Sequence, residues 1–256
     1  MADLELTRRE EFAIITLNRP RALNALSFQL VRDIAAALDE VETSDARAVL
    51  FTGSGDRAFC AGADIKELTG LTLSNQKRTT TFGQRTFARL DSFPIPSVAV
   101  INGYAFGGGM ELASACTFRV ATPNAKMGLP EIKLGLIPGY GGTQRLPRLI
   151  GQARALEIIM SGRTVEAEEA ERIGLVSAIL DGDPMEAAMA FARTFTCYGL
   201  PALSLAREAV LRAGETSLDE GLNAEADLNT LAFQTEDARE GMAAFTDKRP
   251  AVFKDV

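Results

Sequence analysis

The sequence presents two glutamates, Glu111 and Glu131, as its best-framed groups for acid–base chemistry. Glu111 closes the run Gly107-Gly108-Gly109-Met110, and Glu131 follows Gly128-Leu129-Pro130. The chain of 256 residues contains no histidine, the side chain that usually transfers protons near neutral pH. This absence excludes a Ser-His-Asp triad, a Cys-His dyad and the common His-ligated metal sites, so carboxylates become the first candidates for proton transfer.

Glu111 lies where a predicted strand leads through a glycine cluster into an Ala-rich predicted helix. Glycines let the backbone approach a ligand closely. The first N–H groups of a helix have no intrahelical partner and lie at the positive end of its dipole, so they can bind an oxygen that gains negative charge. The alternative is a tight turn at Gly107–Gly109, with Glu111 complementing the helix dipole.

Two further segments can contribute to the same site. In Ala61-Gly62-Ala63-Asp64, small residues lead into a short helix, so the Ala63 N–H can be a second donor and Asp64 can cap the helix. Pro130 predicts the start of a helical turn with Glu131 in its first turn, where burial would raise the pKa of that carboxyl. The alternative for Glu131 is an exposed side chain at a helix start.

Together the three segments supply two backbone donors and two carboxylates. One carboxylate of a close pair can be ionised while the other is protonated, because like charges push their pKa values apart. This set suits enolate stabilisation with proton transfer at the carbon next to an activated carbonyl. The spacing does not fit G-x-G-x-x-G or a P-loop, which argues against a Rossmann dinucleotide site and nucleotide hydrolysis.

Apolar periodicity predicts an α/β fold. Ser27 is the expected N-cap of a helix that reaches about Val41, and a polar helical stretch is expected at 73–90. Strands are expected at 12–17, 48–52, 96–101, 118–121 and 175–179, and further helices at 154–160, 166–173, 184–195, 201–213 and 218–231.

Length and composition favour one large domain, or one domain with a small appendage. The net charge of −7 and the pI near 4.9 argue against a nucleic-acid partner. No apolar run suits a membrane span and the N-terminus lacks a signal-peptide pattern, so we expect no membrane partner and a cytoplasmic protein. Cys60, Cys116 and Cys197 show no metal or disulfide spacing and are expected to be buried, reduced thiols.

The ordered motifs of the whole chain resemble the enoyl-CoA hydratase/isomerase (crotonase) superfamily. The motifs that carry this resemblance are Leu17-Asn-Arg-Pro-Arg-Ala-Leu-Asn-Ala-Leu26, Ala61-Gly-Ala-Asp-Ile-Lys66, Asn102-Gly-Tyr-Ala-Phe-Gly-Gly-Gly-Met-Glu111, Pro130-Glu131-Ile-Lys-Leu-Gly-Leu-Ile-Pro138-Gly, Gly141-Gly-Thr-Gln-Arg-Leu146, Gly174-Leu-Val176 and Phe245-Thr-Asp-Lys-Arg-Pro-Ala-Val-Phe-Lys254.

This resemblance implies a crotonase-like ββα spiral catalytic core over residues 1–197 and a helical C-terminal trimerisation region over 198–256. It implies a homotrimer or a homohexamer built as a dimer of trimers. The implied partner is an acyl-CoA thioester, with coenzyme A entering as part of the substrate and with no separate cofactor and no metal.

The resemblance also implies residue roles. Ala63 and Gly108 would hold the thioester oxygen on their N–H groups, Glu111 would activate water for attack at Cβ, and Glu131 would deliver a proton to Cα. The implied reaction is reversible hydration of a 2-enoyl-CoA to a 3-hydroxyacyl-CoA. The implied substrate-binding residues are Arg21, Ala22, Ala61, Ala63, Asp64, Ile65, Lys66, Gly108, Pro138, Gly139 and Lys254.

Within that set, Arg21 and Lys66, together with Arg19, are candidates for the CoA phosphates, and surface charge is the alternative for each. Lys254 would reach CoA bound to a neighbouring subunit. The segment 68–90 is expected to line the acyl pocket.

Two alternative functions remain open at this stage. One is an enoyl-CoA isomerase, or a hydratase or dehydratase for a branched or carnitinyl-type acyl-CoA; retention of both glutamates favours hydration. The other is a noncatalytic acyl-CoA or RNA-binding scaffold, which the acidic pI and the intact site motifs disfavour. Thr117 and Leu129 depart from residues common in the family, Asp and Gln respectively.

Overall fold

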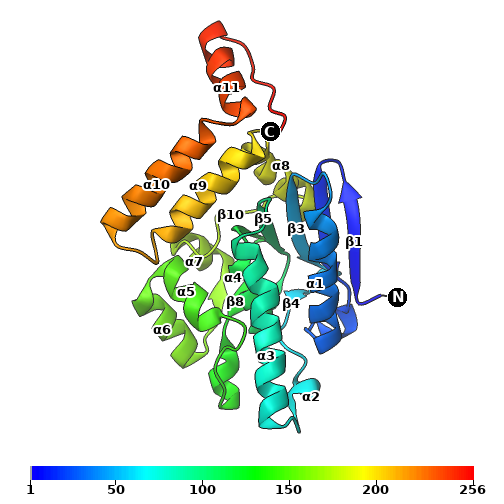
Figure 1. The fold of residues 1–256 in the computed structure, drawn as a ribbon. Helices are drawn as coiled ribbons and strands as arrows, with labels where there is room; N and C mark the ends of the chain where they lie inside the picture. The colour runs from blue at the N-terminus through cyan, green and yellow to red at the C-terminus, as the bar shows by residue number, and fades with distance from the viewer. Residues whose placement is uncertain (1) are drawn as a thin grey trace.

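The structure, a computed structural model, describes residues 2–256 and contains two β-sheets flanked by helices (Figure 1). The six-stranded sheet holds, in spatial order, β1 (Leu4–Arg9), β2 (Phe12–Leu17), β3 (Ala48–Gly53), β5 (Ser97–Ile101), β7 (Phe118–Ala121) and β10 (Ala178–Ile179). The four-stranded sheet holds β4 (Ala58–Cys60), β6 (Tyr104–Phe106), β8 (Lys126–Gly128) and β9 (Val165–Glu166).

The chain alternates between the two sheets as a spiral. Strands β3, β5 and β7 are parallel neighbours in the large sheet, and β4, β6 and β8 are parallel neighbours in the small sheet. Each turn of the spiral therefore adds one strand to each sheet before a helical segment follows. The expected α/β class with a ββα spiral core is confirmed.

The strand sequences explain their positions in the large sheet. All five residues of β5, Ser-Val-Ala-Val-Ile, are buried, as expected for a central parallel strand covered on both faces. Strand β1 is the antiparallel edge strand, and its Leu4 and Leu6 alternate with exposed polar residues. The apolar positions of the sequence thus decide which strands lie at the centre.

Helices follow the strands around both sheets and continue to the C-terminus (Figure 1). The α-helices are α1 (Phe28–Glu42), α2 (Ile65–Leu68), α3 (Leu73–Ala88), α4 (Gly108–Ala115), α5 (Gly142–Ile150), α6 (Gln152–Ser161), α7 (Ala167–Arg172), α8 (Pro184–Thr196), α9 (Leu200–Arg212), α10 (Leu218–Ala232) and α11 (Glu236–Asp247). Short 3₁₀ segments are η1 (Pro20–Ala22), η2 (Arg89–Asp91) and η3 (Pro130–Leu134).

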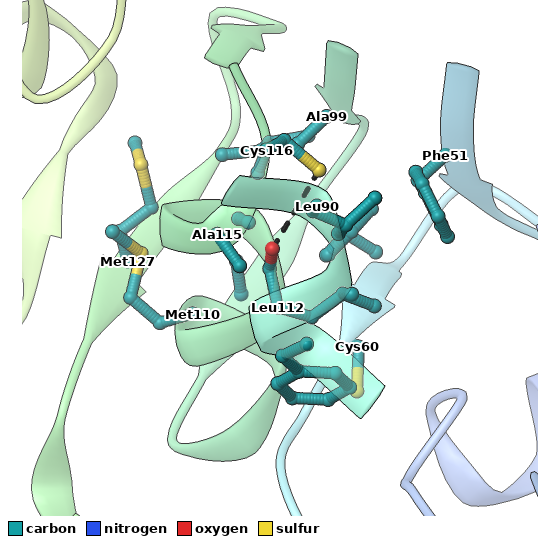
Figure 2. Packing of buried hydrophobic residues seen from close by; sticks show 14 of the residues in the cluster. Phe51, Cys60, Leu90, Ala99, Met110, Leu112, Ala115, Cys116 and Met127 are labelled. Atoms are coloured by element: carbon teal, nitrogen blue, oxygen red, sulfur yellow. Dashed lines mark hydrogen bonds between the residues drawn. The ribbon is translucent and has the colours of Figure 1, made fainter. Parts of the chain in front are cut away.

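Helix α4 is the element that the core surrounds. All eight of its residues are buried, and Figure 2 shows Met110, Leu112 and Ala115 of this helix among apolar side chains from several strands and helices. Gly109 allows α4 to approach β4, because a Cβ at this position would lie 2.1 Å from the Cys60 carbonyl oxygen. Small residues in α4 therefore fix its distance from the small sheet.

Most of the expected elements are present. Ser27 caps α1 through a 3.0 Å bond from the Leu30 N–H to its hydroxyl, and the polar stretch 73–90 forms α3 and most of η2. The strand expected at 175–179 is wrong in its first part, since only Ala178–Ile179 pairs with β7. Leu175 and Val176 instead donate to the Ala170 carbonyl in a turn that ends α7.

The C-terminal part, from residue 198, contains α9, α10 and α11. Helices α9 and α10 pack against each other, and α11 extends at one end of the molecule (Figure 1). The boundary at 197/198 and the trimerisation role of this part stay predictions. Among the helices of residues 2–256, none has both the length and the apolar character that a bilayer crossing requires.

We predict that Gly109→Ala destabilises the protein by about 1–3 kcal/mol, the usual cost of overpacking a core. The added methyl would collide with backbone of β4, which cannot rotate away as a side chain can. Urea denaturation at fixed protein concentration measures the free energy of unfolding. The control is Gly221→Ala inside α10, where a Cβ would meet nothing closer than 3.5 Å and stability should be unchanged or higher. Equal stability of Gly109→Ala and wild type would contradict this account of the α4 packing.

Candidate active site

The glycine cluster before α4 brings Glu131 to the start of that helix. Gly107 has φ +50°, a conformation that favours glycine, and its N–H donates to the Gly128 carbonyl over 3.0 Å. A Cβ on Gly107 would lie 2.9 Å from Oε1 of Glu131. The residue before α4 must therefore lack a side chain for the Glu131 carboxyl to lie there.

Two backbone N–H groups lie close together at this point. Leu26 and Ala63 form a parallel β-bridge in which the Leu26 N–H donates to Gly62 and the Asp64 N–H donates to Leu26, both over 2.8 Å. The Ala63 N–H consequently points away from Leu26. Gly108, the first residue of α4, has an N–H without an intrahelical acceptor, and a Cβ on it would lie 3.6 Å from the Ala63 nitrogen.

Glu111 is held by a second glycine-rich turn, the one that precedes α5. Its Oε1 accepts hydrogen bonds from the backbone N–H groups of Tyr140, over 2.7 Å, and Gly142, over 2.8 Å. Its side chain is almost fully buried, and burial raises the pKa of Glu111 to about 7, with the charge of Glu131 acting in the same direction. The two N–H bonds oppose this shift because they favour the carboxylate.

Glu131 lies in the first turn of η3, as its proline predicts. Burial raises the pKa of this carboxyl above its usual value, in agreement with the expectation for an apolar setting. Its Oε2 is buried and has no hydrogen-bond partner within residues 2–256. A buried polar atom without a partner is rare in folded proteins and marks a place where a ligand or water binds.

The four groups form one arrangement. Two N–H donors lie together, one buried carboxyl is fixed by two hydrogen bonds, and a second carboxyl presents an unpartnered oxygen at the start of the same helix. Such donors stabilise an oxygen that becomes negative, and such carboxyls exchange protons with a neighbouring carbon or water near neutral pH.

Comparison with known proteins agrees with this geometry. The family profile described as enoyl-CoA hydratase/isomerase matches residues 7–256. The chain is 46% identical to YngF of Bacillus subtilis (strain 168) over 97% of this chain and 96% of that protein. It is 38% identical to the crotonyl-CoA hydratase of Syntrophomonas wolfei over 97% of this chain and 96% of the relative.

Solved structures give the same result. The crystal structure of an enoyl-CoA hydratase from Bacillus anthracis superposes with a TM-score of 0.94 at 37% identity, and the match covers 100% of both chains. The chain belongs to the enoyl-CoA hydratase/isomerase family. The resemblance of the ordered motifs is thereby confirmed, and the geometry described above is the candidate site of this family member.

The structure gives Arg19, one of the candidates for the CoA phosphates, a different role. Arg19 donates to the Ala25 carbonyl over 2.6 Å and pairs with Asp64 and Asp3, so its guanidinium is occupied inside the fold. Arg21 and Lys66 are exposed and form no ion pair within residues 2–256, so both remain free to meet phosphates.

The other expected substrate-binding residues lie in η1, in the segment before α2 and at the start of α2. Ala22 ends η1, Ala61 precedes Gly62 and Asp64 follows the Ala63 donor, and Ile65 is 54% exposed at the start of α2. Asp64 caps α2 through the Lys66 N–H over 3.3 Å, as expected.

The remaining expected substrate-binding residues are Pro138, Gly139 and Lys254. Pro138 and Gly139 precede Tyr140, whose N–H binds Glu111. Lys254 is held beside α11, because its N–H donates to Asp237 over 2.7 Å, and Figure 1 shows the C-terminus near α8 and α9, away from α2.

Sequence reasoning missed the residues that hold Glu111 in place. Tyr140 and Gly142 donate the two N–H bonds, and the Gly139-Tyr-Gly-Gly142 run was the available signal for a second donor turn. It also missed that α1 lines a pocket next to Tyr140. A pocket of about 250 Å³ opens between α1 and α3, and its lining residues are Phe28, Val31, Arg32, Arg78, Thr79, Phe82 and Tyr140.

The two departures from common family residues have structural explanations. Thr117 and Ser97 exchange hydrogen bonds at the start of β7 and β5, with each hydroxyl accepting the other residue's N–H over 2.9–3.2 Å. Leu129 is buried against the turn that holds Glu111, since a Cβ on Gly142 would lie 2.9 Å from its Cδ1. The expectation of three buried thiols is wrong for Cys197, which is exposed, whereas Cys60 and Cys116 are buried.

The raised pKa of Glu111 predicts a pH-dependent stability. Its usual value is 4.5 and its folded value about 7, so between these values the folded state keeps a proton that the unfolded state loses. Stability therefore falls as pH rises through this window. We predict that Glu111→Gln raises the free energy of unfolding at pH 8 relative to wild type by on the order of 3 kcal/mol and flattens its pH dependence.

Urea denaturation from pH 5 to pH 8 at one protein concentration measures this effect. Glu225→Gln removes a charge from the exposed face of α10 and serves as the control, with an expected curve close to wild type. A Glu111→Gln variant that loses stability with pH as steeply as wild type does would contradict a raised pKa at Glu111.

Proposed function

We propose that this protein is an enoyl-CoA hydratase that adds water reversibly to a 2-enoyl-CoA and forms a 3-hydroxyacyl-CoA. The observation that carries the proposal is the presence of two carboxyls, each with a pKa raised by burial, beside two free backbone N–H groups. A family member with one carboxyl would lack either the base or the acid of this reaction. Similarity to hydratases such as the crotonyl-CoA hydratase of Syntrophomonas wolfei supports the same reaction class.

In this proposal the N–H groups of Ala63 and Gly108 bind the thioester oxygen. Polarisation of that carbonyl makes Cβ of the conjugated acyl group electrophilic and stabilises the enolate that follows attack. Both donors belong to the backbone, so they need little reorganisation during the reaction. The start of α4 adds the positive end of its dipole at the same point.

The two glutamates divide the proton transfers. Glu111 in its ionised form accepts a proton from water as the water oxygen attacks Cβ, and Glu131 in its protonated form gives a proton to Cα. The bonds from Tyr140 and Gly142 occupy one oxygen of Glu111, which leaves the other oxygen for water. The unpartnered Oε2 of Glu131 faces no competing protein group within residues 2–256.

Binding of the CoA moiety is assigned to exposed groups near the Ala63 donor. Arg21 and Lys66 supply positive charge for phosphate groups. Ala22, Ala61, Asp64 and Ile65 supply the adjoining wall, with Pro138 and Gly139 on the acyl side. The two carboxyls and two N–H groups perform every step, so the proposal assigns no cofactor or metal, and coenzyme A enters as part of the substrate.

We predict that Glu111→Gln and Glu131→Gln each lower kcat for crotonyl-CoA hydration by at least ~10²-fold, the lower range for a positioned acid or base. Mass spectrometry in ¹⁸O-labelled water identifies the incorporated oxygen. Glu225→Gln should keep wild-type rates.

Two outcomes would contradict the proposal. Wild-type rates in both site variants would disprove the assigned roles. Conversion of a 3-enoyl-CoA to its conjugated isomer, without any hydration of crotonyl-CoA, would instead identify an isomerase.

We also propose that the protein assembles as a homotrimer or a dimer of trimers through its C-terminal helices. Large apolar side chains remain exposed there, with Val210 at 72%, Leu218 at 77% and Phe245 at 87%. Exposed apolar groups in one region mark interaction surfaces. Lys254 lies in the same part of the chain, held near α11 because Asp237 accepts from its N–H over 2.7 Å. Assembly would present this lysine to CoA on a neighbouring subunit.

We predict that Phe245→Asp shifts the protein to smaller species in size-exclusion chromatography with light scattering. The control is Leu73→Asp, which introduces the same charge at an equally exposed position, 89%, on α3. Leu73→Asp should keep the wild-type mass. A monomeric wild-type protein would refute the assembly, and an unchanged mass of Phe245→Asp would exclude this residue from the interface.

A further inference from the structure

The pocket between α1 and α3 begins at the proposed catalytic groups. Tyr140 is one of its lining residues, and the backbone N–H of the same residue binds Glu111 over 2.7 Å. The Tyr140 ring also lies near the oxyanion donor, since a Cβ on Gly108 would lie 3.4 Å from its Cδ2. An acyl chain whose carbonyl oxygen is held at Gly108 can therefore enter this pocket directly.

The pocket is large enough to hold only part of a ligand. Its volume of about 250 Å³ is below the ~300–1,000 Å³ of typical complete small-molecule sites. Phe28 and Val31 of α1 and Phe82 of α3 form the apolar section of its lining. This section suits the carbon chain of a short acyl group.

The charged groups that line the pocket are cationic. Arg32 and Arg78 line it from opposite helices, and no aspartate or glutamate is among its lining residues. The side chain of Arg78 forms no hydrogen bond or ion pair within residues 2–256. Arg32 donates Nε and one terminal nitrogen to Gln29, over 3.1 and 2.9 Å, a partner that carries no charge. Both positive charges therefore lack an anionic partner.

The other charged side chains of helix α3, beside the pocket, are also positive. Helix α3 carries Lys77, Arg78 and Arg85 and contains no acidic residue, although the chain as a whole has a net charge of −7. Two acids lie near the lining residue Tyr140, whose pKa is raised by burial and then by the charges of Glu111 and Glu67. The carboxylate of Glu67 accepts the Phe28 N–H, so it already has a partner in the fold.

We infer that the acyl pocket selects a 2-enoyl-CoA whose acyl chain ends in a carboxylate, with Arg78 and Arg32 as the residues that bind this carboxylate. The inference rests on the proposed function, because it takes the thioester carbonyl to lie at Ala63 and Gly108. Apolar side chains and two guanidinium groups in one pocket match a short chain with an anionic end. Guanidinium groups form strong, charge-assisted hydrogen bonds to carboxylates. A plain hydrocarbon end would make no such bond and would leave both exposed guanidinium groups to water.

Saturated thioesters test the inference without any reaction. Glutaryl-CoA and pentanoyl-CoA contain the same number of acyl carbons and differ in a terminal carboxylate or methyl group. Titration calorimetry should show glutaryl-CoA binding about tenfold or more tightly, the scale expected for hydrogen bonds to a charged group. Equal affinities would overturn the inference. Because neither compound is hydrated, this result is independent of the proposed hydratase activity.

Substitutions test which residues cause the preference for glutaryl-CoA. Arg78→Met keeps an apolar stem in the pocket and removes the charge, so it should reduce the preference for glutaryl-CoA by about tenfold and leave pentanoyl-CoA binding unchanged. Arg32→Met should act in the same direction. Arg85→Met, on the same helix but outside the pocket lining, is the matched control and should retain the wild-type preference.

Steady-state kinetics distinguishes binding of the acyl carboxylate by Arg78 from binding of the CoA phosphates. For pent-2-enedioyl-CoA and pent-2-enoyl-CoA, Arg78→Met should lower kcat/KM for the diacid alone. Equal weakening of both substrates would assign Arg78 to the CoA phosphates and overturn the inference. Absence of hydration for every enoyl-CoA, together with a retained preference for glutaryl-CoA in calorimetry, would reject the hydratase proposal and leave the carboxylate site intact.

Discussion

The burial of the Glu111 carboxyl is the constraint on which the rest of this structure depends. A buried carboxylate is expensive unless hydrogen bonds satisfy it, and here two backbone N–H groups bind one of its oxygens. Those donors come from the turn before α5, whereas Glu111 comes from α4. The pair of bonds therefore joins two turns of the spiral at the point where proton transfer is proposed. The same bonds limit how far burial raises the pKa, which keeps both protonation states accessible near pH 7.

Close backbone contacts make this burial possible. Gly109 allows α4 to lie against the Cys60 carbonyl of β4, and Gly107 leaves room for the Glu131 carboxyl at the start of the helix. Gly107 makes room for the Glu131 side chain, and Gly109, two residues later, makes room for strand β4. A side chain at either position would displace the oxyanion donors, because Gly108 lies between them. The glycine run is thus a packing requirement as well as a source of free N–H groups.

The sequence predicted the parts of the fold that depend on local pattern. The α/β class, the capped start of α1 and the buried strands β2, β3, β5 and β7 follow from apolar periodicity and capping chemistry. The strands β4, β6 and β8 were missed, because three residues are too few to show an alternating pattern. Glu111 and Glu131 were found because glycine and proline frame them. Tyr140 was not, because its contribution is a backbone N–H that no side-chain pattern reveals.

The polar and charged groups assigned to the proposed acyl path come from segments that are far apart in the sequence, so local sequence does not show how they combine. In the proposal, backbone N–H groups meet the thioester oxygen, two carboxyls flank the reacting carbons, and two guanidinium groups bind the acyl end. The two carboxyls would repel a carboxylate placed beside them, so an anionic acyl end is tolerated only where positive charge lies apart from them. Phe28, Val31 and Phe82 supply apolar surface in the same pocket as Arg32 and Arg78, and Tyr140 joins this pocket to the Glu111 turn. Glu111 and Glu131 have no cationic hydrogen-bond partner within residues 2–256, and Arg32 and Arg78 have no anionic one, so both sets of groups retain their charge for the substrate.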